Sequence, residues 1–254
     1  MLVLVIPSDR DDLSLALNDS PSNEVRRALC GRLGSAFADV GRLLYVLGSI
    51  VGPDRKSGAS PFRYGSDSTA GLGMVGQIAG ELITSASGLV ESDQYYAAMA
   101  LVRQIVEAEY LAWAFGADHS EAERWLRSIS EDRRRMWQPR HLRERSGDRF
   151  RGKDYQLHCE RGGHPTPDAR FLLPDHSVRL SSSAVLVEIA VHGVSCWDYF
   201  VEAIVELDHA EWYAENVPKR RSVSEFHEAR AQWVELDRFP ELARQYAARR
   251  GDRS

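Results

Sequence analysis

The stretch from Tyr95 to Phe115 constrains the fold most strongly, because it is apolar on nearly every side of a helical wheel. Tyrosine hydroxyls aside, its strongly polar side chains are those of Arg103, Gln104, Glu107 and Glu109. A helix that is apolar nearly all round is buried by neighbours on several faces. We therefore predict that this stretch forms a central helix, surrounded by other parts of the chain.

The central helix carries a pair of opposite charges. Arg103 and Glu107 lie four residues apart, so they share one face of the helix and can form an ion pair. A charge pair inside a buried helix must be neutralised and hydrogen-bonded, because otherwise it costs several kcal/mol. If the pair is buried, replacing Arg103 by Ala should destabilise the fold by roughly 3 kcal/mol. This pair is also the first place to look for function.

Helical periodicity extends over most of the remaining chain. Apolar residues recur at helical spacing over residues 22–48, 68–89, 120–137, 155–161 and 184–215, and again beyond residue 223. The chain has no alternating run of β-branched residues and no hairpin turn pair. We predict an all-α fold, an irregular bundle of about six to eight helices with a long C-terminal helix at 184–215.

The domain organisation follows from the same pattern. We expect an N-terminal arm over 1–22, a single helical domain over 23–217, and short C-terminal helices over 218–254 that pack on it or extend as a tail. Residues Gly71 to Gly76 formally read GxGxxG, but no strand precedes them and no βαβ unit follows, as a dinucleotide site requires. Gly76 and Gly80, four residues apart, better fit a helix-packing face.

Composition bounds the class of protein. The 254 residues carry a net charge of −5 and 43% hydrophobic side chains, which is typical of a soluble globular protein and argues against a general nucleic-acid binder. Three cysteines without a CxxC motif indicate free thiols in a reducing compartment. The apolar run at the N-terminus is too short for a signal peptide or a membrane span. We expect a cytoplasmic protein with no membrane segment.

The charge is unevenly distributed. Residues 124–153 contain eleven Lys and Arg, whereas residues 181–217 contain seven Asp and Glu and no basic residue. Either these segments face each other or lie on separate solvated faces, or the basic segment meets a polyanion. Arg133, Arg134 and Arg135 beside Trp137 could bind single-stranded nucleic acid by phosphate contact and base stacking. The alternative is a solvated face that pairs with its own acids, such as Glu131 and Asp132.

A second polar motif follows the central helix by some fifty residues. It reads DYQLHCERGGHPTP and contains Tyr155, Arg161 and His164. Together with RQIVEAEYLAWAF, it resembles uncharacterised bacterial helical domains of the HEPN superfamily, over Tyr95 to Pro167. The resemblance implies an all-helical domain in a group that contains ribonuclease toxins and defence proteins. Active HEPN ribonucleases have more residues between the motif arginine and histidine than the two that separate Arg161 and His164.

Candidate catalytic residues follow from this motif: Arg103, Glu107, Tyr155, Arg161 and His164. Metal-free RNA cleavage needs an acid or base that titrates near neutrality, which histidine supplies, and a cation for the phosphate, which arginine supplies. The same residues also fit a structural role, in which Tyr155 donates to Glu107 and His164 bonds a helix end. A pocket for a small molecule or a phosphate is a third interpretation.

Metal binding is a weaker alternative. His158, Cys159 and His164 cluster in one turn, and His192 and Cys196 share a helix face, so four of them could form a tetrahedral zinc site. No single spacing matches a known zinc finger. Glu206 and His209 form one Glu-x-x-His, but a carboxylate-bridged di-metal bundle needs a second, which is missing. We therefore predict neither a metal nor a cofactor.

Two functional hypotheses remain. The first is a non-enzymatic helical protein that acts through protein partners or as a homo-oligomer, in a bacterial defence or toxin–antitoxin system. The second is a HEPN-like, metal-independent ribonuclease that acts on RNA with His164 and either Arg161 or Arg103. Catalysis requires His164 and an arginine to converge at an open cleft, often across a dimer interface. A structural role requires Arg103, Glu107 and Tyr155 to be buried and mutually satisfied.

Overall fold

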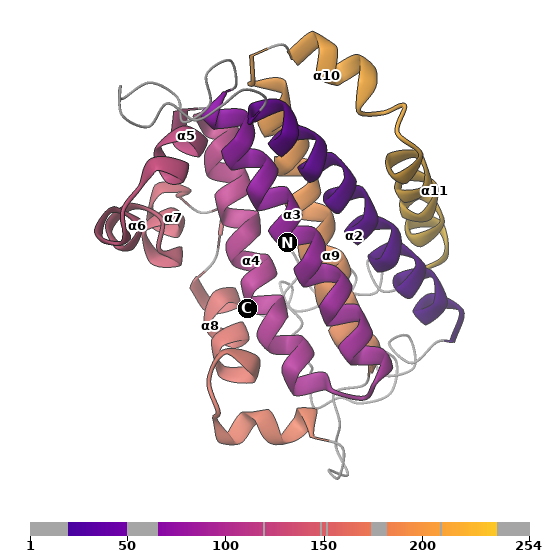
Figure 1. Ribbon diagram of the computed structural model, residues 1–254. Coiled ribbons are helices and arrows are strands. Elements are labelled where there is room, and N and C mark those ends of the chain that lie inside the picture. Colours follow the sequence, from indigo (N-terminus) through magenta and orange to yellow (C-terminus); the bar gives the residue numbers. More distant parts are fainter. Residues whose placement is uncertain are drawn as a thin grey trace, which may run out of the picture.

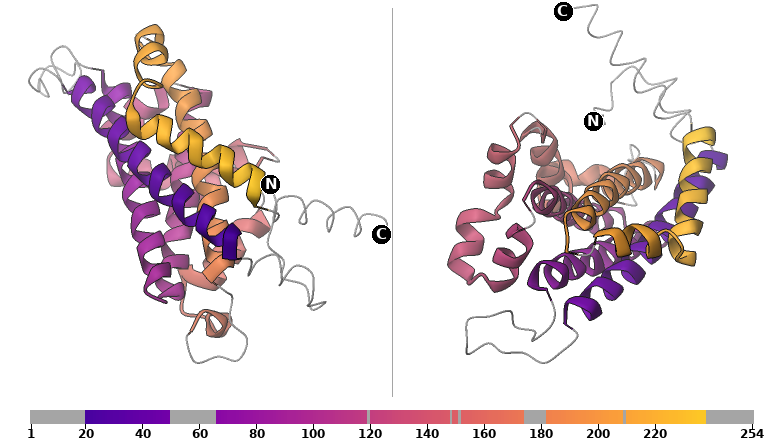
Figure 2. Two further views of the ribbon diagram at one scale, coloured as in Figure 1. Left: turned by 90° about the vertical axis from the view of Figure 1, so that its right-hand side faces the viewer. Right: turned by 90° about the horizontal axis from the view of Figure 1, so that it is seen from above.

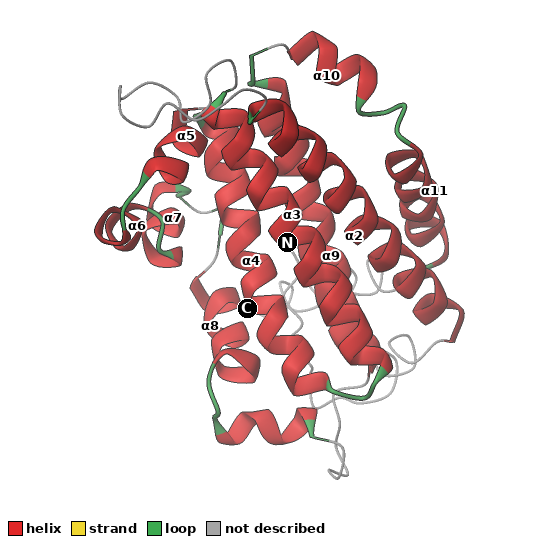
Figure 3. Ribbon diagram, in the orientation of Figure 1, coloured by secondary structure: helices red, strands yellow, loops and turns green. Residues whose placement is uncertain are grey.

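The computed structural model describes residues 20–49, 66–118, 120–147, 149–150, 152–173, 182–208 and 210–237. Every regular element within these ranges is a helix, which confirms the all-α prediction (Figure 3). The described residues form ten α-helices, more than the six to eight predicted. The N-terminal arm, except its last residues, lies outside these ranges, as does the chain beyond residue 237.

Four long helices build the bundle and eight shorter helices or turns surround it. The long ones are α2 (Ser20–Gly48), α3 (Asp67–Glu91), α4 (Tyr95–Ala117) and α9 (Ser182–Val205). The others are α5 (Ser120–Arg127), α6 (Ser130–Met136), α7 (Pro139–Arg145), α8 (Gly152–His158), a π-helical turn η1 (Cys159–Gly163), a 3-10 turn η2 (Pro167–Leu172), α10 (Ala210–Asn216) and α11 (Arg221–Leu236).

The four long helices run side by side, with α4 packed between α3 and α9 (Figure 1). Helices α5 to α7 lie on one flank of the bundle, and α10 and α11 lie on the opposite flank (Figure 2). Helix α8 and the turn η1 pack against α4. The apolar character of α4 thus has the predicted cause, because neighbours cover it on several sides.

Glycines set the close packing of α2 on α3. A Cβ atom at Gly41 would stand 2.6 Å from the backbone nitrogen of Gln77, and one at Gly80 would stand 2.9 Å from the backbone nitrogen of Ala38. A Cβ at Gly76 would stand 2.7 Å from the ring of Phe200 on α9. The predicted packing face is therefore confirmed, and the GxGxxG pattern lies inside α3, where it serves helix contacts.

The C-terminal part of the bundle is held by aromatic packing and one buried ion pair. The Phe37 and Trp197 ring centroids lie 5.0 Å apart, and those of Trp197 and Phe226 lie 5.1 Å apart, so α2, α9 and α11 share one aromatic cluster. Arg26 of α2 donates to both carboxylate oxygens of Asp237, at 2.6 and 2.5 Å, and both side chains are 0% exposed. This pair attaches the end of α11 to the start of α2.

The prediction of one long C-terminal helix at 184–215 is wrong. The helix ends at Val205 and a second one begins at Ala210, so α2, with 29 residues, is longer than α9, with 24. At the break, the Leu207 N–H donates to the Ile204 carbonyl, a tighter turn than an α-helix makes. The turn lets Leu207 and, further on, Tyr213 point into the core.

The predicted helix at 120–137 is also divided, into α5 and α6. The Asp118 carboxylate caps α5: it accepts from the Ser120 N–H at 3.0 Å and from the Ser120 hydroxyl at 2.8 Å. The gap between the two helices leaves Ile129 exposed on the surface.

Helix α9 is long and apolar enough to cross a membrane by length and composition. However, 72% of its apolar window is buried inside the bundle, as in a core helix. Such a helix is weak evidence for a membrane span.

Candidate functional site

The predicted cluster on α4 forms largely as expected. Arg103 lies 3.2 Å from Glu107 and donates to the Tyr155 hydroxyl oxygen at 3.2 and 3.3 Å, while the Tyr155 hydroxyl donates to Glu107 at 2.9 Å. Burial, together with the Glu107 carboxylate, raises the pKa of Tyr155 to about 12 against the effect of Arg103. Tyr155 therefore stays protonated and acts as a donor. The side chains of Arg103 and Glu107 are 29% and 33% exposed, so the pair lies at the edge of the bundle.

The turn η1 seats the second predicted motif on α4. A Cβ at Gly162 would stand 2.5 Å from the Met99 backbone, and one at Gly163 would stand 2.8 Å from the Arg103 side chain. Only glycine allows the approach at position 162, because the atoms that a Cβ would meet there belong to the backbone of α4. The turn thus places Arg161 and His164 near the Arg103 cluster.

The turn does not join its own two candidate residues. His164 is exposed, and its backbone N–H donates to the Cys159 carbonyl. Arg161 is half-buried, and burial lowers its pKa, while the charge of Glu188 on α9 acts in the opposite sense. In the part of the chain that the structure describes, no hydrogen bond or ion pair links the His164 side chain to Arg161 or Arg103.

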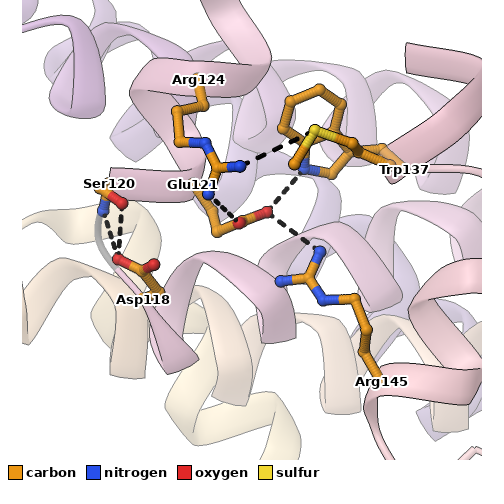
Figure 4. A network of polar contacts seen from close by, with 7 residues as sticks. Asp118, Ser120, Glu121, Arg124, Trp137 and Arg145 are labelled. Carbon is orange, nitrogen blue, oxygen red and sulfur yellow. Dashed lines mark hydrogen bonds and ion pairs between the residues drawn. The ribbon is translucent and has the colours of Figure 1, made fainter. Parts of the chain in front are cut away.

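The basic segment folds around one buried carboxylate (Figure 4). Glu121 of α5 accepts from the Trp137 indole N–H at 2.9 Å, from Arg145 at 3.2 Å and from Arg124 at 2.8 Å. Trp137 is only 7% exposed. The prediction that Trp137 offers a stacking surface for bases is therefore wrong, because Glu121 holds the indole inside α5 to α7.

The surface around this carboxylate is basic. A pocket of about 580 Å³ lies between α5, α6 and α7. Its lining combines three arginines and a histidine with two carboxylates and a methionine: Arg124, Arg135, Arg145, His141, Glu121, Glu144 and Met136. Arg133 and Arg134 are exposed on the same helix as Arg135. The three predicted arginines therefore lie on the surface, beside or lining this pocket.

A third cluster lies inside the bundle, where α4, α8 and α9 meet. Glu109 of α4 accepts from Ser195 at 2.6 Å and lies 2.8 Å from His192 Nδ1. His192 Nε2 in turn lies 3.0 Å from His158 Nε2. One Glu188 carboxylate oxygen lies 3.6 Å from His158 Nε2 and 3.5 Å from His192 Nε2. The side chains of His158, His192 and Glu188 are 3%, 6% and 11% exposed.

The two histidines have opposite protonation preferences. Burial lowers the pKa of His158 to about 4, so its ring is neutral at physiological pH. Burial also acts to lower the pKa of His192, but the carboxylates of Glu109 and Glu188 outweigh it and raise the pKa to about 10. Burial would raise the pKa of Glu188, yet His192 and the other nearby cations lower it. The cluster therefore favours the charged form of His192 and the neutral form of His158.

Sequence reasoning identified only part of this cluster. It grouped His158 and His192 with three further residues, Cys159, His164 and Cys196, as a zinc alternative. The structure joins the two histidines to Glu188 instead, and neither Cys159 nor Cys196 belongs to the group of donor atoms that it brings together. Glu188 and His192, four residues apart on one apolar helix, were the signal that could have revealed the third ligand.

No family model, curated protein or solved structure matches the chain. Its function therefore has to be inferred from these three clusters.

Proposed function

We propose that the protein is a non-enzymatic helical protein that binds an acidic protein partner through the basic pocket of α5 to α7. The observation that carries this proposal is the set of arginines around the pocket, whose guanidinium groups outnumber the carboxylates that line it. The resemblance to HEPN domains links such a role to bacterial defence or toxin–antitoxin systems.

Two of the arginines are available to a partner. Arg134 is exposed and has no acidic partner among the residues that the structure describes. Arg135 is exposed, and its ion pair within the described ranges is with Asp132, at 3.6 Å. Exposed ion pairs contribute about 0–1 kcal/mol, so a partner's carboxylates can replace Asp132 at little cost. Arginine also binds carboxylates through two parallel hydrogen bonds, which adds specificity.

A protein partner fits this surface better than single-stranded RNA does. Sites for single-stranded nucleic acid combine basic side chains with aromatic rings on which bases stack. The residues that line the pocket include no aromatic side chain, and Trp137 is buried behind them. Charge is therefore the feature that the pocket offers for recognition.

The test is binding of two labelled probes, a poly-glutamate peptide and a poly-uridine RNA, measured by fluorescence anisotropy at low and moderate salt. We expect salt-dependent binding of the peptide. The variant Arg135→Glu should weaken it about tenfold or more, because each 1.4 kcal/mol of lost interaction is a factor of ten. Arg221→Glu is the matched control, since Arg221 is 91% exposed on α11, on the opposite flank.

Three outcomes contradict the proposal. Binding of RNA without binding of the peptide would indicate a nucleic-acid partner. Equal loss of binding in the Arg221→Glu control would show that only overall charge matters. Absence of binding to both probes at low salt would remove the pocket from consideration.

A metal-independent ribonuclease is the second candidate, and one contact favours it. Gly163 lies directly against the Arg103 side chain, so the turn that carries His164 sits beside an arginine of α4. The test is cleavage of several RNAs by the purified protein with chelator present, beside His164→Ala. Under our first proposal the wild type does not cleave. Cleavage that disappears in an equally stable His164→Ala variant would establish the ribonuclease instead.

A further inference from the structure

We propose that His158, Glu188 and His192 form a buried binding site for a divalent transition-metal ion such as Zn²⁺. The site goes beyond the partner-binding role above and lies in the bundle interior, apart from the pocket of α5 to α7. Either proposal can therefore fail without the other. The argument starts from the positions of three donor atoms.

The three donor atoms are spaced as metal ligands are. The triangle formed by His158 Nε2, His192 Nε2 and the Glu188 oxygen has sides of 3.0, 3.5 and 3.6 Å. A point equidistant from its corners lies about 2.0 Å from each atom, which is the length of a Zn–N or Zn–O bond. Tetrahedral ligands at that bond length lie about 3.3 Å apart, close to the observed sides.

The two ring nitrogens require a proton or a cation between them. Two imidazole lone pairs that face each other at 3.0 Å repel, unless one nitrogen carries a proton or both bind a cation. A proton on His192 Nε2 accounts for its contacts with His158 and with Glu188, but not for the approach of His158 Nε2 to Glu188. A metal ion accounts for all three, because Glu188 would bind it as well.

A second layer of residues orients one ligand. His192 Nδ1 lies 2.8 Å from the Glu109 carboxylate, and the Ser195 hydroxyl holds the other oxygen of that carboxylate. A proton on Nδ1 leaves the Nε2 lone pair directed at the other two donors. This carboxylate–histidine arrangement is the usual support of a metal-bound histidine.

The other histidine lacks any such support from the protein. His158 Nδ1 is buried and has no hydrogen-bond partner among the described residues. No protein group therefore fixes the ring through that atom. A metal ion at Nε2 would supply the missing restraint and would tie α8 to α9.

The donor set selects the class of ion. Imidazole nitrogens with one carboxylate suit zinc and other first-row transition metals, whereas Ca²⁺ and Mg²⁺ prefer oxygen ligands only. Two histidines and one glutamate leave the fourth position of a tetrahedral zinc ion open. All three ligands are nearly inaccessible to solvent and lie on α8 and α9, so the ion would connect these two helices. The expected effect of the ion is therefore to stabilise the fold.

The test uses the untagged full chain, with metal removed by chelator and then titrated with Zn²⁺ in a calorimeter. We expect one ion per chain and a melting temperature that rises with zinc concentration, because the folded state binds the ion and the unfolded state does not. Glu109→Gln should weaken binding by about tenfold to a hundredfold, as removal of such a supporting carboxylate does. His227→Ala, an exposed histidine on α11 far from the triangle in the sequence, is the control and should leave the affinity unchanged.

A conservative ligand variant covers the case in which His158→Ala or His192→Ala does not fold. Glu188→Gln keeps the side-chain volume and should abolish stoichiometric zinc binding. With Co²⁺ as the probe, the wild type should show the visible absorption of a tetrahedral site and Glu188→Gln should not. If the wild type binds neither ion, or if Glu188→Gln binds both as the wild type does, a proton holds the cluster together and the proposal is wrong.

Discussion

Two ion pairs show how much the surroundings of a residue decide its energetic role. Arg26–Asp237 has both side chains at 0% exposure, whereas Arg103–Glu107 has 29% and 33%. The sequence directs attention to the second pair, because both residues lie on one apolar helix. In the structure that pair is screened by solvent, so we expect Arg103→Ala to cost about 1 kcal/mol rather than about 3 kcal/mol.

Replacing Arg26 by Met should be far more destabilising. The variant leaves the Asp237 carboxylate buried without its cation, which typically costs about 3–5 kcal/mol. Chemical denaturation by urea measures the change in unfolding free energy. The double variant Arg26→Met/Asp237→Leu should recover part of the loss, since no charge then remains buried. A single variant as stable as the wild type would contradict the importance of this pair.

The carboxylate of Asp39 makes stability depend on pH. Its hydrogen bond with Arg220, helped by Ser222, lowers its pKa although partial burial opposes this. A lowered folded-state pKa means that the stabilisation is fully present above the unfolded-state value, about 3.9, and is lost as pH falls through the folded-state pKa.

Asp39→Asn should therefore be less stable than the wild type near pH 7, by up to about 1 kcal/mol because the pair is partly exposed. The difference should shrink as pH falls below about 3.9. Thermal unfolding of both proteins over a pH series measures it. A difference that stays constant down to strongly acidic pH would show that Asp39 contributes through something other than its charge.

At the scale of elements, the spacing between α2 and α3 depends on glycines, which have no side chain and let the two backbones approach. Gly41 faces the backbone of α3, whereas a Cβ at Gly31 on the same helix would meet nothing within 4 Å. Both are glycines inside one helix, yet only the first is required for packing. Sequence alone treats them alike, because helix propensity is a local property.

Gly41→Ala and Gly31→Ala should thus change stability in opposite directions. Gly41→Ala forces the two backbones apart and should cost about 1–3 kcal/mol. Gly31→Ala should stabilise by up to about 1 kcal/mol, the difference in helix propensity between the two residues. Thermal melts followed by circular dichroism test both variants. The idea fails if the two substitutions change the melting temperature in the same direction.

At the scale of the whole molecule, ion pairs form within each flank. Arg124, Arg127 and Arg140 pair with acids of their own segment, and Arg127 also pairs with Asp67 of α3. Asp198, in the acidic segment, pairs with Arg230 of α11. The described ion pairs therefore do not join the basic segment to the acidic one. The excess positive charge of the basic segment remains available to a partner.

Burial inside the bundle also determines which cysteine thiols can react. Cys30 and Cys196 are buried, and burial raises the pKa of Cys30 to about 12, whereas Cys159 is half-buried. A thiol reagent at pH 8 should therefore modify one thiol in the native protein and three after denaturation, because the thiolate is the reactive form. Three rapidly reacting thiols in the native protein would contradict this packing.

Features of the fold that depend on residues within a few helical turns of one another could be predicted from the sequence. Periodicity placed the four long helices, and a spacing of four residues predicted the Arg103–Glu107 contact. Periodicity overestimated the length of the last long helix, because the chain turns at Leu207 and buries side chains against other helices. Helix propensity contains no information about such distant partners.

The composition of the buried cluster could not be predicted from the sequence. Glu109, His158 and His192 come from α4, α8 and α9, so their meeting depends on how three helices cross rather than on any spacing within one of them. The same holds for Trp137: the sequence allowed base stacking as one of its roles, whereas in the structure Glu121 holds its indole inside. Burial is a property of the packed bundle, and burial is what turns ordinary polar residues into a candidate site.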